Sequence, residues 1–290
     1  MSGVAATGNP GFHRKVFGAT TVTALSDGWL TLPNEALLGI APDDAKAMRD
    51  AAFRGPQPRS SVNAFLVQSG GRTVLVDTGA GDKAYPTLGR LMGSLAAAGV
   101  QPGDVDAVLL THLHIDHWGG LTTADGAAAF PRAEVVLPAA EAAYWLDAAT
   151  AATAPEDAKP RFAGAQAAVA PYRDRMRTFA GTAPVLGLHP VPLPGHTPGH
   201  TGYMLDDGGA RLLIWGDVMH VPDVQAGHPE VGIGFDSDPV EAVASRRRAL
   251  EMAVGEGLMV TGMHLHFPGF THVTRVGDAY ALVPELWLAD

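Results

Sequence analysis

Short apolar runs, bounded by glycine or by polar residues, recur along the chain and predict strands. A Ser-Gly-Gly stretch at 69–71 favours a hairpin turn between two of them. Residues 88–98 fit the spacing of an amphipathic helix, which Gly99 would end. The expected strands are Val22–Ser26, Asn63–Val67, Thr73–Asp77, Ala107–Leu110, Glu134–Leu137, Val185–Leu188, Gly202–Leu205, Leu212–Trp215 and Leu258–Thr261.

The second half of the chain contains two stretches of helical character. Residues 139–179 are rich in alanine, glutamate, arginine and glutamine and are interrupted by three prolines, which predicts a set of helices rather than a linker. Residues 240–254 predict one longer helix. The chain shows no repeat period and no Ser/Gly linker. We therefore expect a single domain over residues 10–290, with two sheets flanked by helices, in the α+β class.

Composition narrows the classes of function. The chain has 290 residues, of which 47% are apolar and 17% are charged, as is usual for a soluble globular enzyme. Its formal net charge of −10 disfavours nucleic acid as a partner. The sequence has no cysteine, so any metal ion must be held by imidazole and carboxylate. No apolar run approaches the roughly 18 residues of a membrane span. Met1–Pro10 lacks a secretory signal, so a cytoplasmic location with no membrane partner is expected.

Polar side chains crowd together after one buried strand, in the stretch VLLTHLHIDHWGG at 108–120. In an extended segment, residues two apart point the same way, so His112 and His114 can bind one ion together. Asp116 and His117 follow where the chain turns and point elsewhere, as a second nearby ion would need. Zinc suits these ligands best, with manganese, cobalt or iron as alternatives. Surface histidines or a satisfied hydrogen-bond network would explain a lone histidine better than this cluster.

Three later stretches offer further ligands. LPGHTPGHTGY at 193–203 carries two histidines in a loop rich in glycine and proline, LLIWGDVMH at 212–220 ends a buried strand with an aspartate, and VTGMHLHFPG at 260–269 carries two more histidines. Each stretch is expected at the carboxyl end of a strand, where open α/β sheets place their sites. The candidate residues are His196, His200, Asp217, His220, His264 and His266.

The combination of HxHxDH, PGHTPGH, GD and a late histidine resembles the metallo-β-lactamase superfamily of binuclear metallohydrolases, from NAFLV at 63 to HLHFPG at 264–269. The loop GDVMHVPDVQ and the HLHFPG stretch look closest to the branch of methyl parathion hydrolases and related lactonases. The resemblance implies an αβ/βα four-layer sandwich, in which two mixed sheets pack face to face with helices outside. It also implies a homodimer. In that dimer, the apolar segment WLTLPNEALLGI at 29–40 is expected to form the contact between subunits or to line the pocket of the neighbouring subunit. The alternative is that the segment covers the sheet of its own chain.

The resemblance assigns roles residue by residue. One ion falls to His112, His114 and His196, the other to Asp116, His117 and His264, and Asp217 bridges them. His200 is then structural and His266 is not a ligand. Asp77 would hydrogen-bond the ligand loop, although a strand-ending turn explains it equally well, and Thr111 would help to orient that loop.

The implied chemistry is hydrolysis. Two divalent ions with two carboxylates leave a strongly positive centre, at which a bridging hydroxide attacks a carbonyl or phosphoryl group. Asp116 is expected to take part in proton transfer. His220 stands where many lactonases of the superfamily carry a tyrosine that assists the leaving group. We expect it to donate a proton there, with shaping of the pocket as the alternative.

The expected substrate is a small uncharged ester, either a lactone or a carboxylic ester, with organophosphate triesters as a further class. Aromatic residues that would form an apolar cleft are Trp29, Tyr85, Tyr144, Trp145, Phe162 and Phe235. A glyoxalase-II-like thioesterase is the first alternative, although lysine and arginine are sparse in the matching regions. Redox enzymes of this fold are the second alternative, either mononuclear-iron sulfur dioxygenases or di-iron flavoproteins. A non-catalytic binding module would usually have lost a ligand.

Overall fold

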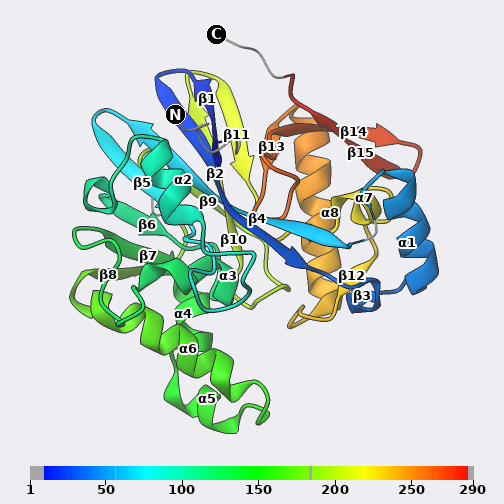
Figure 1. The fold of residues 1–290 in the computed structure, drawn as a ribbon. Coiled ribbons are helices and arrows are strands. Elements are labelled where there is room, and N and C mark those ends of the chain that lie inside the picture. Colours follow the sequence, from blue (N-terminus) through cyan, green and yellow to red (C-terminus); the bar gives the residue numbers. More distant parts are fainter. Residues whose placement is uncertain (1–9, 56, 183–184, 287–290) are drawn as a thin grey trace, which may run out of the picture.

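Two mixed β-sheets form the centre of the structure, a computed structural model that describes residues 10–55, 57–182 and 185–286 (Figure 1). The first sheet has seven strands in the order β1-β2-β4-β5-β6-β7-β8. Neighbours are antiparallel from β1 to β5 and parallel from β5 to β8. Its strands are β1 Phe12–Phe17, β2 Thr20–Thr31, β4 Arg59–Ser69, β5 Arg72–Val76, β6 Ala107–Leu109, β7 Glu134–Pro138 and β8 Met176–Phe179.

The second sheet has six strands in the order β15-β14-β13-β11-β10-β9, with β11 and β13 as its parallel pair. A separate ribbon pairs the short strands β3 and β12 near the lower end of both sheets in Figure 1. The bounds are β3 Leu37–Leu38, β9 Leu188–Pro192, β10 Thr201–Asp207, β11 Ala210–Ile214, β12 Gly232–Ile233, β13 Met259–Thr261, β14 Thr271–Val276 and β15 Ala279–Pro284.

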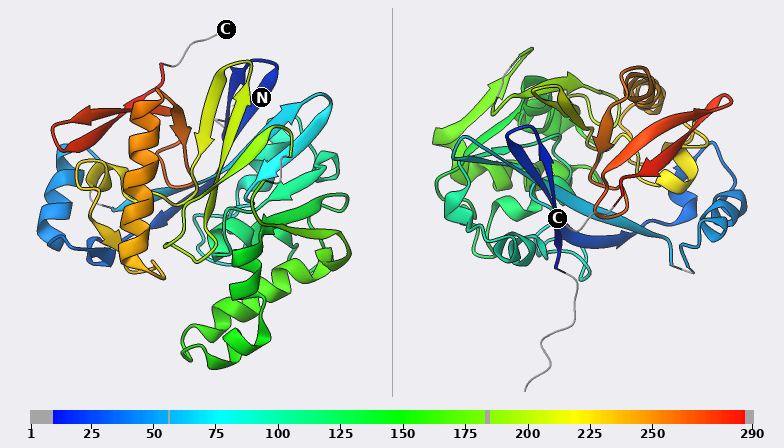
Figure 2. Two further views of the ribbon diagram at one scale, coloured as in Figure 1. Left: turned by 180° about the vertical axis from the view of Figure 1, so that it is seen from behind. Right: turned by 90° about the horizontal axis from the view of Figure 1, so that it is seen from above.

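Helices lie on the outer faces of the two sheets (Figure 2). Helices α2, α4 and α6 cover the first sheet, and α8 covers the second. Among the described residues, no helix has the length and apolar character needed to cross a membrane. The α-helices are α1 Pro42–Ala51, α2 Leu91–Ala97, α3 Ile115–Trp118, α4 Ala139–Trp145, α5 Ala148–Thr153, α6 Lys159–Val169, α7 Pro222–Gln225 and α8 Pro239–Gly255, with 3₁₀ turns at Asn34–Ala36, Pro102–Asp104, Gly119–Leu121 and Ala170–Arg175.

Alternation along the strands explains the layers. On β4, Phe65 and Val67 point into the core between the two sheets, whereas Ala64 and Leu66 point into the core beneath the helices of the first sheet. Successive strand residues face opposite sides, so a strand that is apolar at every position must be covered on both faces. The result is four layers, helix–sheet–sheet–helix, which confirms the predicted α+β sandwich of two mixed sheets packed face to face. The single domain expected over residues 10–290 stays a prediction, and residues 287–290 lie outside the described part.

Several predicted elements are confirmed, most with wider bounds and one, β5, shifted by one residue. The expected strands at 22–26, 63–67 and 73–77 correspond to β2, β4 and β5, and the helix expected at 240–254 corresponds to α8. The turn between β4 and β5 is formed by Gly70 and Gly71, with φ values of 56° and 75°. Both residues adopt the left-handed backbone conformation, which a two-residue hairpin turn of type I′ requires at its two central positions.

Three predicted boundaries are wrong. The strand expected at 185–188 begins only at Leu188, because Leu186 and Gly187 adopt φ values of 52° and 72° and form a turn there. The helical stretch expected over 139–179 ends in strand β8, which pairs in parallel with β7. The helix expected from residue 88 begins at 91, where the Leu91 N–H donates to an Asp27 carboxylate oxygen at 3.0 Å. A local turn decided the first boundary, pairing with β7 the second, and a hydrogen bond to a distant residue the third.

The sequence patterns did not indicate the elements at the edges. Strands β1 and β15 lie at sheet edges, and β14 pairs with β15. All three carry exposed positions, so their apolar runs are interrupted. Helix α1 has a polar outer face and was not expected either. These elements are stabilised by contacts with the rest of the chain, which local patterns do not encode.

The carboxyl ends of the central strands meet at one edge, where the two sheets are hydrogen-bonded to each other. The Thr201 N–H at the start of β10 donates to the Thr111 carbonyl at 3.0 Å, and the Asn63 N–H of β4 donates to the Met263 carbonyl at 2.9 Å. The Trp215 N–H after β11 also donates to the Thr261 carbonyl of β13 at 2.9 Å, so the segments that follow β6, β11 and β13 are held near one another. They carry most of the candidate ligands.

Candidate metal centre

The HxHxDH segment changes direction in its middle, and this turn distributes its side chains. The backbone is still extended at His114, with φ −85° and ψ 157°, and helix α3 begins at the next residue. His112 and His114 therefore leave an extended stretch, whereas Asp116 and His117 leave a helical turn. The sequence spacing predicted this separation of the four side chains into two pairs. His112 and His117 are fully buried.

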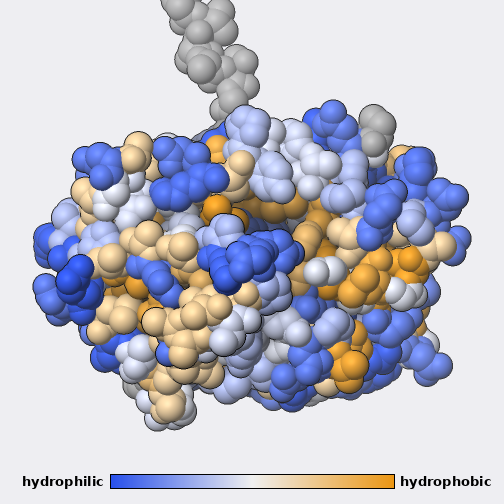
Figure 3. All heavy atoms as spheres, turned by 90° about the horizontal axis from the view of Figure 1, so that it is seen from below, coloured by the Kyte–Doolittle hydropathy of each residue, from blue (hydrophilic) through white to orange (hydrophobic). Residues whose placement is uncertain are grey.

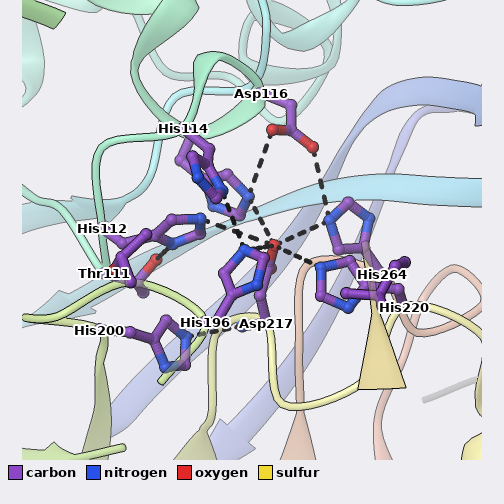
Figure 4. A network of polar contacts seen from close by, with 12 residues as sticks. Thr111, His112, His114, Asp116, His196, His200, Asp217, His220 and His264 are labelled. Atoms are coloured by element: carbon purple, nitrogen blue, oxygen red, sulfur yellow. Dashed lines mark hydrogen bonds and ion pairs between the residues drawn. The ribbon is translucent and has the colours of Figure 1, made fainter. Parts of the chain in front are cut away.

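The side chains of the candidate ligands converge on Asp217, which follows β11 (Figure 4). Its carboxylate lies at the centre of the close-up, with histidines on several sides and Asp116 beyond them. The distances from Asp217 Oδ2 to imidazole Nε2 atoms are 3.1 Å for His117, His220 and His264, 3.4 Å for His196 and 3.7 Å for His112.

The ligand atoms form two overlapping sets. His112, His114 and His196 present ligand atoms within 4.8 Å of one another, and so do Asp116, His117 and His264. His114 Nδ1 lies 2.9 Å from His196 Nε2, and Asp116 oxygens lie 3.6 Å and 3.4 Å from the Nε2 atoms of His117 and His264. Asp217 shares a further set with His112 and His117 and another with His196 and His220, so it lies between the two.

Several buried polar atoms of this cluster have no hydrogen-bond partner among the described residues. They are His112 Nε2, His117 Nε2, Asp217 Oδ1 and His220 Nδ1. A buried polar atom without a partner is costly, so such atoms usually indicate a missing ion or water. Imidazole nitrogens and carboxylate oxygens are ligands that zinc, manganese, cobalt and iron accept. The cluster thus fits divalent metal ions.

Hydrogen bonds on the far side of the rings orient the nitrogens. The Nδ1 atoms of His117, His196 and His264 donate at 2.8 Å to Asp77 Oδ2, Asp236 Oδ1 and the Ser61 carbonyl, respectively. His112 Nδ1 lies 3.0 Å from Thr111 Oγ1, which itself donates to Asp77. With each Nδ1 directed at an oxygen, each Nε2 points toward the centre, where it can bind an ion once it carries no proton.

Asp77 holds the HxHxDH segment at several points. It accepts from the Thr111 N–H at 2.8 Å and from the Thr111 hydroxyl at 2.7 Å, in addition to His117. Its φ of 59° is left-handed, a strained conformation for a residue with a side chain. The strand-ending turn and the contact with the ligand segment are therefore both present, and the expected orienting position of Thr111 is seen as well.

The electrostatics of the cluster follow from burial and from its carboxylates. Burial lowers the pKa of His112 and of His114 well below the usual value, which keeps both rings neutral. For His196 burial also acts downward, but Asp217 and Asp236 outweigh it and raise the pKa to about 9. Burial would raise the pKa of Asp217, yet His117 and the other surrounding imidazoles hold it well below its ordinary range. Asp217 therefore stays ionised and attracts positive charge.

The remaining histidines of the three later stretches lie outside the two ligand sets. His200 Nδ1 donates to the Leu193 carbonyl, and its Nε2 accepts from the Asp217 N–H at 2.9 Å, so it positions the backbone of Asp217. His266 contacts Asp223 at 2.8 Å, and Arg54 donates to the same carboxylate. The structural role of His200 and the exclusion of His266 as a ligand stay predictions.

His220 occupies a position between the cluster and the open space beside it. Its ring stacks on His264 with centroids 4.8 Å apart, and burial lowers its pKa to about 4. The backbone is fixed on both sides, because the His220 N–H donates to Gln225 Oε1 and the Ser60 hydroxyl donates to the His220 carbonyl. A ring held in this way can act on a group bound over the centre.

A cavity of about 590 Å³ opens beside the cluster. Its lining is largely apolar, and six of these residues are here called the cavity wall: Leu30, Leu32, Tyr85, Ile115, Trp118 and Phe235. Figure 3 views the molecule from below and shows apolar patches set among hydrophilic residues. Among the described residues that line the cavity outside the cluster, Arg161 is the charged one.

The structure corrects part of the expected aromatic cleft. Tyr85 and Phe235 line the cavity, but Tyr144, Trp145 and Phe162 pack into the core beneath the first sheet. Trp29 lies against the Arg59 guanidinium instead. Trp118 of the WGG turn was not expected in the cleft, but it lines the cavity. Large aromatics on helices of a four-layer fold are more often core than cleft, and sequence alone did not separate the two.

The segment 29–40 belongs to its own chain's cavity. Leu32 and Leu37 are buried against Ala45, Val224 and Ile233, and five residues from the segment, including Leu30 and Pro33, line the cavity. The segment therefore covers elements of its own chain, which was the alternative to a dimer contact, although Leu38 is 41% exposed. The homodimer itself stays a prediction.

Sequence reasoning missed two acidic residues of the centre. Asp236 contacts His196 from the loop before α8, and Glu141 accepts hydrogen bonds from both ligand loops of the first set. Neither belongs to a recognisable motif. Their full or near-full burial is the signal that identifies them, and it is visible only in three dimensions.

Comparisons with known proteins agree on the family. The family model described as metallo-beta-lactamase superfamily matches residues 58–264. A solved structure described as hydrolase AbOPH in the beta lactamase superfamily is 31% identical, with a TM-score of 0.93 over 98% of this chain and 100% of the other. AidC, a dizinc quorum-quenching lactonase solved with the product N-hexanoyl-L-homoserine, is 24% identical, with a TM-score of 0.90 over 96% and 99%. A probable metallo-hydrolase of Mycobacterium tuberculosis is 29% identical over 71% of this chain and 73% of its own length.

Proposed function

The chain belongs to the metallo-β-lactamase superfamily of metal-dependent hydrolases, and from this premise we propose that it is a binuclear enzyme that hydrolyses small uncharged esters. Lactones and carboxylic esters are the proposed substrates, and organophosphate triesters are a further class that the same site would accept. The observation that carries the proposal is the convergence of two ligand sets on the buried carboxylate of Asp217.

We assign one divalent ion to His112, His114 and His196 and the other to Asp116, His117 and His264, with Asp217 between them. Zinc is the proposed metal, with manganese, cobalt or iron as alternatives. Divalent ions supply Lewis acidity for the substrate oxygen and lower the pKa of water from about 15.7 to about 7. The unpartnered Nε2 atoms of His112 and His117 support this assignment.

The chain's own residues then bind, orient and move protons. Asp217 and Asp116 compensate positive charge, and Asp116, the less buried of the two, is proposed to accept a proton during the attack. His220 is proposed to donate a proton to the alkoxide that leaves. Its place on the cavity side of His264 puts the ring next to a bound substrate. Because burial keeps the ring neutral, His220 must first take up the proton released in the attack, and it can then pass that proton to the alkoxide oxygen that leaves.

The cavity supports an uncharged, partly apolar substrate. Its wall is apolar, and a volume of about 590 Å³ is that of a small-molecule site. A thioesterase for glutathione conjugates would need several cations for the carboxylates of the substrate, and the described lining offers Arg161. A mononuclear-iron redox enzyme would leave the Asp116, His117 and His264 set unused, although these side chains also converge.

A substrate panel with defined metals tests the proposal. Metal-stripped protein is reloaded with zinc, manganese, cobalt or iron and assayed on aryl esters, alkyl lactones, phosphotriesters and a glutathione thioester. We expect turnover of the lactones and esters with two equivalents of metal. Turnover of the thioester alone, or oxidation with one equivalent of iron, would contradict the proposal.

We also propose that the protein acts on its substrate as a homodimer in the cytoplasm. Sedimentation velocity at micromolar concentration tests the assembly, for which twice the mass of 30.1 kDa is expected. A monomeric mass across the concentration range would contradict it.

A further inference from the structure

A glutamate lies fully buried behind the first ligand set. Glu141 is the third residue of α4, and its exposed fraction is 0%. A buried carboxylate loses its hydration, so it is retained only where it makes enough hydrogen bonds to compensate. No step of the proposed reaction uses this residue.

The carboxylate of Glu141 joins two loops that carry ligands. Its Oε1 accepts from the Leu113 N–H at 2.8 Å, and Leu113 stands between His112 and His114. Its Oε2 accepts from the Thr197 hydroxyl at 2.8 Å and from the Gly199 N–H at 2.9 Å, just after His196. One side chain therefore connects the segment after β6 of the first sheet to the loop between β9 and β10 of the second.

The backbones on either side of this contact approach closely. A Cβ atom at Gly199 would lie 2.2 Å from the Glu141 nitrogen, a distance that real contacts do not show. The second Pro-Gly of PGHTPGH is thus required for the loop to rest on α4. Within the same helix, the Trp145 ring packs edge-on against His114 with centroids 5.6 Å apart. Helix α4 therefore supports the first ligand set at several points.

The contacts of Glu141 are confined to one of the two sets. They reach the backbone beside His112, His114 and His196, and its bonded partners do not include Asp116, His117 or His264. The second set is instead oriented by Asp77 through His117 and by the Ser61 carbonyl through His264. A change at Glu141 should therefore affect the first ion more than the second.

Burial raises the pKa of the Glu141 carboxyl, while the donors from Leu113, Thr197 and Gly199 oppose that shift. Three donors directed at two oxygens suit the ionised form. The neutral amide of glutamine, with one oxygen, can satisfy the donors on one side and must turn its own N–H groups toward a donor on the other.

We propose that Glu141 is a positioning residue that sets the separation of His114 and His196 and thereby controls binding of one of the two metal ions. The proposal rests on the proposed function, because it requires the metal centre. It adds a role for a residue that contacts neither the ions nor the substrate.

The test is a metal competition on the full chain. Wild type and Glu141→Gln are loaded with zinc, titrated with a chelator and analysed for bound zinc per chain at each step. Wild type is expected to release two ions at high chelator concentration. In the variant, one ion should leave with an affinity lower by about 10- to 100-fold, as is usual when a supporting group of a metal ligand is changed. The second ion should follow the wild-type curve.

Combined variants show which ion is lost. Glu141→Gln added to His264→Ala should leave no tightly held zinc, because each change weakens a different set. Glu141→Gln added to His114→Ala should lose no more zinc than His114→Ala alone. Asp77→Asn is the contrasting buried carboxylate, because Asp77 contacts His117 of the second set and also Thr111, which supports His112 of the first set. It should weaken both ions, unlike Glu141→Gln.

Two further variants guard against general loss of structure. Thr197→Val removes one of the donors to Glu141 and should weaken the same ion in the same direction but less. Leu95→Ala opens the core beneath the first sheet from α2, with no polar contact of Glu141 removed, and should leave the zinc titration unchanged. Equal loss of both ions in Glu141→Gln, or a wild-type titration in it and in Thr197→Val, would overturn the proposal. A wild-type chain that binds no zinc would contradict the proposed function and this inference together.

Discussion

The metal cluster and the cavity wall lie side by side but are built in opposite ways. In the cluster, His117 and His196 each contact Asp217 through one nitrogen and an outer carboxylate through the other. On the wall, Tyr85 and Phe235 have exposed fractions of 52% and 43%, and each comes from a loop. The cluster is held by directional bonds, whereas the wall is held by apolar contacts that tolerate changes of shape.

The difference teaches which part of the molecule sets which property. A ligand must be held in place to keep its ion, and hydrogen bonds from behind fix His112, His117, His196 and His264. Even the Asp217 loop is held in this way, because the buried Arg246 side chain donates to the Val218 carbonyl at 2.7 Å and to the Val231 carbonyl at 2.8 Å. Changes in the cluster should alter metal binding and rate. Changes in the wall should alter the choice of substrate.

The largest effect is expected at the centre of the cluster. Asp217→Ala removes the carboxylate shared by both ligand sets, which leaves four positive charges of the two ions less compensated. Both ions and hydrolysis should be lost, as measured by metal analysis and by the ester assay. The exposed carboxylate of Asp206 provides the control, and Asp206→Ala should behave as wild type. Two bound metals with near-normal activity in Asp217→Ala would refute the ligand assignment.

His220 stands at the border between the two regions and should show a divided effect. If it protonates a poor alkoxide leaving group, His220→Ala should slow alkyl lactones by about 10²-fold or more. Activated aryl esters, whose phenolate leaves without help, should be almost unaffected, and both metals should remain. Equal slowing of the two substrate types would mean that His220 positions the substrate or the cluster and does not act as an acid.

A smaller loss of metal affinity is expected when a residue that hydrogen-bonds a ligand, rather than the ligand itself, is changed. Asp236→Asn weakens the acceptor of the His196 Nδ1 proton and should reduce metal affinity or activity by about 10- to 100-fold. Asp238→Asn is a close control, because Asp238 caps α8 and is two residues away without touching His196. If both variants lose the same amount of zinc in a chelator titration, the effect comes from the loop as a whole.

The smallest effect is expected on the wall. Phe235→Ala should leave both metals in place and change the preference between bulky and small acyl groups by about 1 kcal/mol, the low end for an apolar contact. A panel of esters with increasing acyl length measures this as ratios of kcat/KM. Trp145→Ala is the contrast, since Trp145 is buried in the core and should cost about 3–5 kcal/mol of stability with no such change in preference. Loss of metal in Phe235→Ala would show that wall and cluster are not separable.

The metal cluster could be predicted from the sequence better than the cavity wall. The residues His112, His114, Asp116 and His117 were recognisable because four costly polar groups stand within six positions after a buried strand. Their local spacing corresponds to their geometry, since the chain is extended up to His114 and helical after it. The layers were predictable because strands covered on both faces read as continuous apolar runs.

The rest depended on contacts between distant segments. Three charged residues support the centre through hydrogen bonds to partners far away in the sequence: Asp236 over 40 positions, Glu141 over 28 and Arg246 over 28. No local pattern distinguishes them from surface charges. The wall is assembled from the end of β2, the loop before α2, α3 and the loop before α8. Whether an aromatic such as Trp145 faces the core or the cavity is decided by that assembly.

The most direct test of the central claim is a titration of metal-stripped protein with zinc while lactone or ester hydrolysis and bound zinc are measured together. If the two ligand sets around Asp217 form one catalytic centre, activity should rise from background and reach its full value at two zinc ions per chain. Full activity in the metal-free protein, or full activity at one ion with no second ion bound, would contradict the account.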